Sequence, residues 1–95
     1  MFIINVSYKV SLKTIDQYIA NHIKFLDEQY DLGNFIVSGR KVPRTGGVIL
    51  SNISDKKGLL EIIEKDPFKI HDLADYNITE FIPSKTSEGL KFLIS

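Results

Sequence analysis

Cysteine is absent from this 95-residue sequence, and its absence excludes several classes of functional site. Disulfide bonds, thiolate nucleophiles, zinc fingers and cysteine-ligated iron–sulfur clusters all require it. Only His22 and His71 could offer imidazole to a metal ion, and His71 with Asp75 at helical spacing is at most a weak surface candidate. We therefore expect neither a metal site nor a cofactor.

The sequence also lacks a net charge and a long apolar run. Twelve basic and twelve acidic residues cancel, so no overall field draws the molecule to nucleic acid or to an anionic membrane. No apolar run approaches the ~18 residues that span a bilayer, and residues 1–6 lack the basic segment and cleavage site of a signal peptide. We expect a cytoplasmic protein that binds neither nucleic acid nor membrane.

What the chain does contain is enough apolar material for the core of one domain, with 43% hydrophobic and 11% aromatic residues. Alternating apolar residues predict a first strand from Phe2 to Val10. Further strands are expected at 34–39, 48–53 and 76–82, and the loop at 42–47 carries a proline and a pair of glycines. Leu90, Phe92 and Ile94 suggest additional extended structure in the tail.

Between the first two strands, the sequence predicts a long amphipathic helix that contains His22. Ser11 can cap its start near residue 12, and Gly33 can supply the left-handed residue that commonly ends helices. At ~100° per residue, one side of this helix gathers Ile15, Ile19, Ile23, Leu26 and Tyr30. His22 falls among them. A histidine placed against a core has either a buried hydrogen-bond partner or a chemical task.

A second helix, capped by Ser54-Asp55, brings a possible partner for His22. This helix must stop by Asp66, because Pro67 disfavours helical geometry in the residue before it, and a short helical turn follows at 67–73. A carboxylate at Asp66 could fix the tautomer of His22 and make it a general base. The structural alternatives are a satisfied core histidine and an N-cap aspartate before proline, and both stay open at this point.

The predicted order βαββαβ indicates an α+β, ferredoxin-like fold, with one four-stranded antiparallel sheet and both helices on one face. The strands are nevertheless apolar on both sides, since Ile3 opposes Ile4 and Ile49 opposes Val48. An open apolar face requires a partner. We therefore expect a homodimer in which two sheets pack face to face.

Ser38-Gly39, at the end of the second strand, is a further candidate. The serine hydroxyl could donate to a ligand oxygen and the glycine leaves room for a ligand, although a strand bend explains the glycine equally well. Ser38 lacks the setting of a catalytic nucleophile, so we assign it a binding role only. Arg40, Lys41 and Arg44 could receive a carboxylate or phenolate, or could simply form a solvated loop.

Taken in order, these segments resemble the YciI-like, or YCII-related, family of small single-domain proteins. The segments are Tyr8-Lys9-Val10, Asn21-His22-Ile23-Lys24-Phe25-Leu26, Val37-Ser38-Gly39, Val42-Pro43-Arg44-Thr45-Gly46-Gly47-Val48-Ile49-Leu50 and Asp66-Pro67-Phe68. The resemblance covers about residues 2–84 of a single domain and leaves 85–95 as a tail. It implies a dimeric α/β barrel of ferredoxin-like protomers, similar in fold to muconolactone isomerase.

The resemblance also implies site residues. The family's active-site histidine and aspartate match His22 and Asp66, and its small residues after the second strand match Ser38 and Gly39. Many members carry proline where this chain has Arg40, which leaves the path of the loop and the charge of the pocket open.

Two functions follow as expectations. The first is a lyase or isomerase in which His22, oriented by Asp66, moves a proton on a small cyclic or aromatic substrate, halogenated rings included, that Ser38, Gly39 and Arg40 hold. The second is a non-catalytic dimer that binds a small ligand or a partner and uses the His22–Asp66 contact as a structural hydrogen bond. A fold alone does not decide between them.

Overall fold

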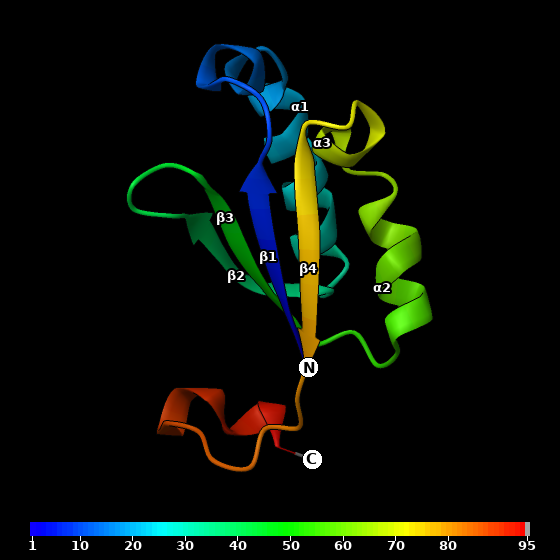
Figure 1. The fold of residues 1–95 in the computed structure, drawn as a ribbon. Helices are drawn as coiled ribbons and strands as arrows, with labels where there is room; N and C mark the ends of the chain where they lie inside the picture. The colour runs from blue at the N-terminus through cyan, green and yellow to red at the C-terminus, as the bar shows by residue number, and fades with distance from the viewer. Residues whose placement is uncertain (95) are drawn as a thin grey trace.

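The computed structural model describes residues 1–94 and shows one four-stranded antiparallel sheet with helices on one face (Figure 1). The sheet order is β2-β3-β1-β4, formed by β1 (Phe2–Tyr8), β2 (Phe35–Arg40), β3 (Gly46–Ser51) and β4 (Ala74–Glu80). The helices are α1 (Leu12–Asp31), α2 (Lys56–Ile63), the short α3 (Pro67–Ile70) and a 3₁₀ helix, η1 (Glu88–Leu93). This arrangement confirms the predicted α+β, ferredoxin-like fold.

The helices begin and end where local signals place them. The Ser11 side chain accepts a hydrogen bond from the Thr14 amide at 3.3 Å, and the Asp55 side chain accepts one from the Gly58 amide at 2.9 Å. Gly33 has a φ of 76° just beyond the end of α1. The two side chains supply hydrogen-bond acceptors for backbone amides that have no partner within the first turn of a helix. The left-handed conformation of Gly33 ends α1.

The strand boundaries differ from expectation, most clearly at β3. Gly46 and Gly47, expected in the loop, open this strand, and it ends at Ser51 instead of residue 53. A Cβ at Gly46 would lie 1.8 Å from the carbonyl oxygen of Val6 in β1, so glycine is required for the two strands to pair. β4 is likewise displaced by two residues from the predicted 76–82.

The tail is helical where extended structure was expected, so that prediction was wrong. Leu90 and Phe92 lie in η1, and the amides of Leu90 and Ile94 donate to the carbonyls three residues earlier, Ser87 and Lys91, at 3.1 Å each. Local hydrogen bonds replace strand pairing because this segment reaches no strand edge of the sheet.

Alternation along β1 separates the two faces of the sheet. Phe2, Ile4 and Val6 are at most 3% exposed and contribute to the core, together with apolar residues of the helices. The helix residues in this core are Ile15 and Phe25 of α1, Leu59 and Ile63 of α2, and Phe68 of α3.

The other face of the sheet carries no helix among the described residues (Figure 1). Val37, Leu50, Ile3 and Thr79 form one row across it in register, and Ile3 and Val37 are 37% and 56% exposed. The β2–β3–β1 part of this row is therefore apolar, as the sequence predicted. Within residues 1–94, no helix is long and apolar enough to cross a membrane.

Candidate functional site

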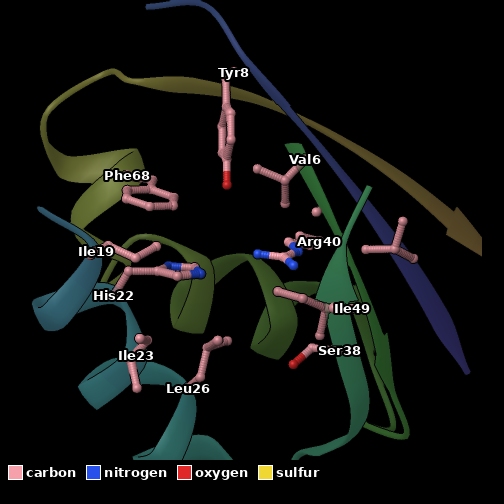
Figure 2. A pocket seen from close by; sticks show the side chains of 13 residues that line it. Val6, Tyr8, Ile19, His22, Ile23, Leu26, Ser38, Arg40, Ile49 and Phe68 are labelled. Atoms are coloured by element: carbon pink, nitrogen blue, oxygen red, sulfur yellow. The ribbon is translucent and has the colours of Figure 1, made fainter. Parts of the chain in front are cut away.

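A cavity of about 280 Å³ lies between α1 and the helix-covered face of β1, β2 and β3 (Figure 2). Most of its wall is apolar, and includes Val6, Ile19, Ile23, Leu26, Ile49 and Phe68. Polar side chains enter it from both sides, His22 from α1 and Tyr8, Ser38 and Arg40 from the sheet. A mostly apolar cavity with a few convergent polar groups is typical of a small-molecule site.

His22 lies against Asp66, which sits just behind the cavity. The Nδ1 atom of His22 is 2.8 Å from Oδ1 of Asp66, and the two side chains are 13% and 1% exposed. An ionised carboxylate can only accept hydrogen bonds, so this contact requires the proton on Nδ1. The nitrogen left for a ligand is Nε2, and the ring reaches into the cavity (Figure 2).

Asp66 receives two further hydrogen bonds. Its Oδ1 accepts from the Phe68 amide at 3.0 Å, as an N-cap of α3, and its Oδ2 accepts from the Tyr76 hydroxyl at 2.5 Å. Burial and the neighbouring Asp66 raise the pKa of Tyr76, which keeps its hydroxyl protonated as a donor. The N-cap role and the contact with His22, weighed above as alternatives for Asp66, therefore coexist.

Phe68 fixes the plane of the imidazole. Its ring stacks on that of His22 with the centroids 4.0 Å apart and the planes 8° from parallel. The Tyr8 ring meets the same Phe68 ring edge-on at 5.8 Å. The Asp66-Pro67-Phe68 turn therefore supplies both a hydrogen-bond acceptor and a stacking surface for His22.

The buried side of α1 is rotated slightly from the predicted stripe. Ile15, Phe25 and Gln29 are buried, whereas Ile23 is 49% exposed at the cavity. His22 lies on the same side of α1 as these buried residues. Its ring therefore faces α3 and stacks on Phe68.

Ser38, Gly39 and Arg40 all line the cavity, with Ser38 and Arg40 on the helix-covered face of β2. The Ser38 hydroxyl accepts a hydrogen bond from the Tyr30 hydroxyl at 2.7 Å, which leaves its own proton for another acceptor. In register opposite Arg40 stands Gly47, whose missing side chain leaves space beside the guanidinium.

His71 lies outside this site. It is exposed and its ring stands 4.4 Å from that of Tyr18. Over residues 1–94, no group of three or more His, Cys, Asp or Glu side chains could hold a metal ion.

Tyr8 and Tyr76 are the site residues that the sequence analysis missed. Both lie on the helix-covered face of the sheet, in line with Val6 on β1 and Ile78 on β4. The period-two pattern could have assigned them to that face. It could not have shown that Tyr76 reaches Asp66, because that contact depends on how α3 packs beside β4.

The fold has a solved counterpart. The structure of 5-chloro-2-hydroxyhydroquinone dehydrochlorinase from Burkholderia phenoliruptrix, in complex with 2,5-dihydroxybenzoquinone, matches with a TM-score of 0.74. The match covers 84% of this chain and 91% of that one at 18% sequence identity. At this identity the likeness establishes a common fold and no common reaction.

A search of curated proteins finds no match. The family model described as the YCII-related domain matches residues 1–82, which is most of the chain and includes every residue of the site. On this evidence, the chain belongs to the family of YCII-related domain proteins.

Proposed function

We propose that this protein is a lyase or isomerase that transfers a proton on a small cyclic or aromatic substrate, with Nε2 of His22 as the base. The observation that carries the proposal is the 2.8 Å contact between Nδ1 of His22 and the buried Asp66 carboxylate, at the wall of a mostly apolar cavity. A carboxylate in this position stabilises the imidazolium that forms when Nε2 takes up a proton.

In the proposed reaction, the substrate proton moves to Nε2 while Nδ1 keeps its own proton and its bond to Asp66. Ser38 and Arg40 bind the substrate, and the Gly39 backbone lines the cavity between them. The name of the structural counterpart supports a halogenated ring as one substrate type. In that case the proton goes to His22, the electron pair that it leaves behind forms a new π bond in the substrate, and the halide leaves with the electron pair of its bond to carbon.

The tautomer of His22 provides a test that needs no substrate. Since Asp66 binds Nδ1, NMR of nitrogen-labelled protein at a pH where the imidazole is neutral should show the proton on Nδ1 and a bare Nε2. A neutral ring with its proton on Nε2 could not act as a base toward the cavity, and would contradict the proposal.

A matched pair of histidine variants tests the chemistry. With 5-chloro-2-hydroxyhydroquinone as the first probe and chloride release as the readout, His22→Ala should lower turnover by ~10²–10⁴-fold. His71→Ala is the control, because His71 is exposed outside the cavity, and its turnover should match the wild type. Full activity of His22→Ala on any substrate that the wild type converts would overturn the assignment.

A non-catalytic ligand-binding protein is the second candidate. The other hydrogen bonds of Asp66 favour this function, because a carboxylate that caps α3 and accepts from the Tyr76 hydroxyl already has a structural role. If this function holds, His22→Ala lowers the free energy of unfolding by ~1–3 kcal/mol, as for a lost buried hydrogen bond, and nothing is turned over. Changed NMR signals of the His22 ring on adding 2,5-dihydroxybenzoquinone, with no turnover of 5-chloro-2-hydroxyhydroquinone by the wild type, would favour this second function.

The proposal includes a homodimer. Its basis is the open face of the sheet, where Ile3, Val37 and Leu50 form a contiguous apolar row without a covering helix among residues 1–94. Two copies related by a two-fold axis would bury this row against itself.

A further inference from the structure

The charge of the cavity wall differs from that of the whole chain. Basic and acidic residues balance over the sequence. Among residues 1–94, however, no aspartate or glutamate lines the cavity, and Arg40 is the only lysine or arginine that does. Asp66 lies behind the wall, where it is 1% exposed and accepts hydrogen bonds from three donors. A ligand in the cavity therefore meets a positive charge and no exposed negative one.

Arg40 is also the one cation of its loop without a partner among the described residues. Lys41 donates to the Ser7 hydroxyl at 3.1 Å on the opposite face of the sheet, and Arg44 is paired with Asp16 at 2.6 Å. No ion pair involving Arg40 occurs within residues 1–94. Its guanidinium instead turns into the cavity (Figure 2).

The Tyr8 hydroxyl points into the same space. Tyr8 is the last residue of β1, its ring packs edge-on against Phe68, and its hydroxyl points into the cavity into which the Arg40 guanidinium also turns (Figure 2). Both groups are hydrogen-bond donors. They reach the cavity from the sheet, whereas His22 reaches it from α1.

We infer that the cavity binds its ligand as an oxyanion, namely a small ring whose ionised hydroxyl is held by the Tyr8 hydroxyl and the Arg40 guanidinium. This inference rests on the proposed function and narrows its substrate class to phenolates and enolates. A guanidinium and an O–H group stabilise negative charge on oxygen better beside a mostly apolar wall than in bulk water.

The arrangement also orients the ring. With the oxygen at Tyr8 and Arg40, the body of the ring lies along apolar side chains such as Ile19 and Ile49, and its opposite edge faces His22. The residue at position 40 therefore determines specificity, since Arg40 is the one lysine or arginine among the described residues that line the cavity.

Binding of 4-nitrophenol tests the inference, because its anion absorbs visible light and its neutral form does not. The wild type should bind the anion at least tenfold more tightly than the neutral form, and so lower the apparent pKa of the bound probe. Arg40→Gln should weaken anion binding by about ten- to a hundredfold, the range expected for hydrogen bonds to a charged group. Tyr8→Phe should weaken it in the same direction.

Lys41→Gln is the matched control. It makes the same change in net charge one residue away, but the Lys41 side chain bonds to Ser7 on the other face, so binding should equal that of the wild type. The inference is overturned if Arg40→Gln and Lys41→Gln weaken the anion equally, if both forms of the probe bind the wild type alike, or if neither binds saturably at millimolar concentration.

These outcomes are separate from those of the proposed function. The probe is bound and not converted, so a failure of His22 as a base leaves the anion preference intact. Conversely, a missing anion preference leaves the tautomer of His22 unchanged. Circular dichroism of each variant confirms that a lost preference does not come from unfolding.

Discussion

At the scale of single residues, Asp66 determines what His22 can do. Its carboxylate is 1% exposed and is surrounded by donors from three elements, namely α1, α3 and β4. Burial of a carboxylate is tolerated only when its oxygens are bound in this way. The same contacts that make Asp66 part of the core hold it in one position beside Nδ1 of His22.

Tyr76→Phe tests this dependence. The substitution removes one hydrogen bond from a buried oxygen of Asp66, so the free energy of unfolding near neutral pH should fall by ~1–3 kcal/mol. Urea unfolding followed by circular dichroism measures the loss. Tyr18→Phe is the control, because Tyr18 contacts the exposed His71 and lies away from Asp66. Equal stability of Tyr76→Phe and the wild type would contradict the role given to Tyr76.

The deficit of Tyr76→Phe should also shrink in alkali. The pKa of Tyr76 is raised above the ordinary 10.0 in the folded protein. As the pH rises above 10.0, the tyrosine loses its proton in the unfolded chain but keeps it in the folded chain. The free energy of unfolding of the wild type therefore declines. Phenylalanine does not titrate. The gap between the two proteins should therefore narrow as the pH rises above 10.0.

At the scale of elements, the pairing of β1 with β3 shapes the site. This pairing places Val6 opposite Gly47 and Ser7 opposite Gly46, at the end of the sheet where Tyr8 enters the cavity. Two consecutive glycines let the backbones approach there and leave the floor of the cavity open. The hairpin partner β2 then presents Ser38 and Arg40 on the same side.

Gly46→Ala should disturb this pairing. Its Cβ would meet the Val6 carbonyl oxygen at 1.8 Å, and this contact is with backbone that cannot rotate away. The expected loss in the free energy of unfolding is at least ~1–3 kcal/mol, typical of overpacking. Gly39→Ala in the neighbouring strand makes the same chemical change with nothing within 4 Å, and should cost no stability. Urea unfolding of both variants compares them, and equal losses would argue against the close approach.

At the scale of the whole molecule, the two faces of the sheet differ in what covers them and in what they can bind. One face, which α1 and α2 cover (Figure 1), forms the core and the cavity, and the other face carries the apolar row of Ile3, Val37 and Leu50. The cavity lies next to β2, at the edge of the sheet. Dimerisation through the open face would leave the helix-covered face of each protomer accessible to a ligand.

Ile3→Lys tests the homodimer. A lysine at the β1 end of the apolar row would bring a charge into the buried interface, so the variant should be monomeric at micromolar concentration in light scattering, while the wild type is dimeric. Ile70→Lys makes the same change at an exposed position of α3, away from this face, and should stay dimeric. A wild type that is monomeric at micromolar concentration would show that no such dimer forms.

Much of the fold could be predicted from the sequence because its signals are local. Helix caps act over three residues, as at Ser11 and Asp55, and Gly33 adopts its left-handed conformation by itself. The two-residue period of β1 separated core from open face. The predictions were wrong at the ends of β3 and β4 and in the tail, where strand pairing and the close approach at Gly46 set the boundaries.

By itself, then, the sequence determined the order of elements, the two faces of the sheet and the unusual place of His22 on α1. Only the tertiary structure decided which residues His22 contacts. His22 and Asp66 are 44 residues apart in the chain, and Tyr76 reaches Asp66 from a third element. Such contacts depend on how α1, α3 and the sheet pack together, and no local periodicity carries that information. The same packing turns Tyr8 and Arg40 toward the cavity that His22 faces (Figure 2).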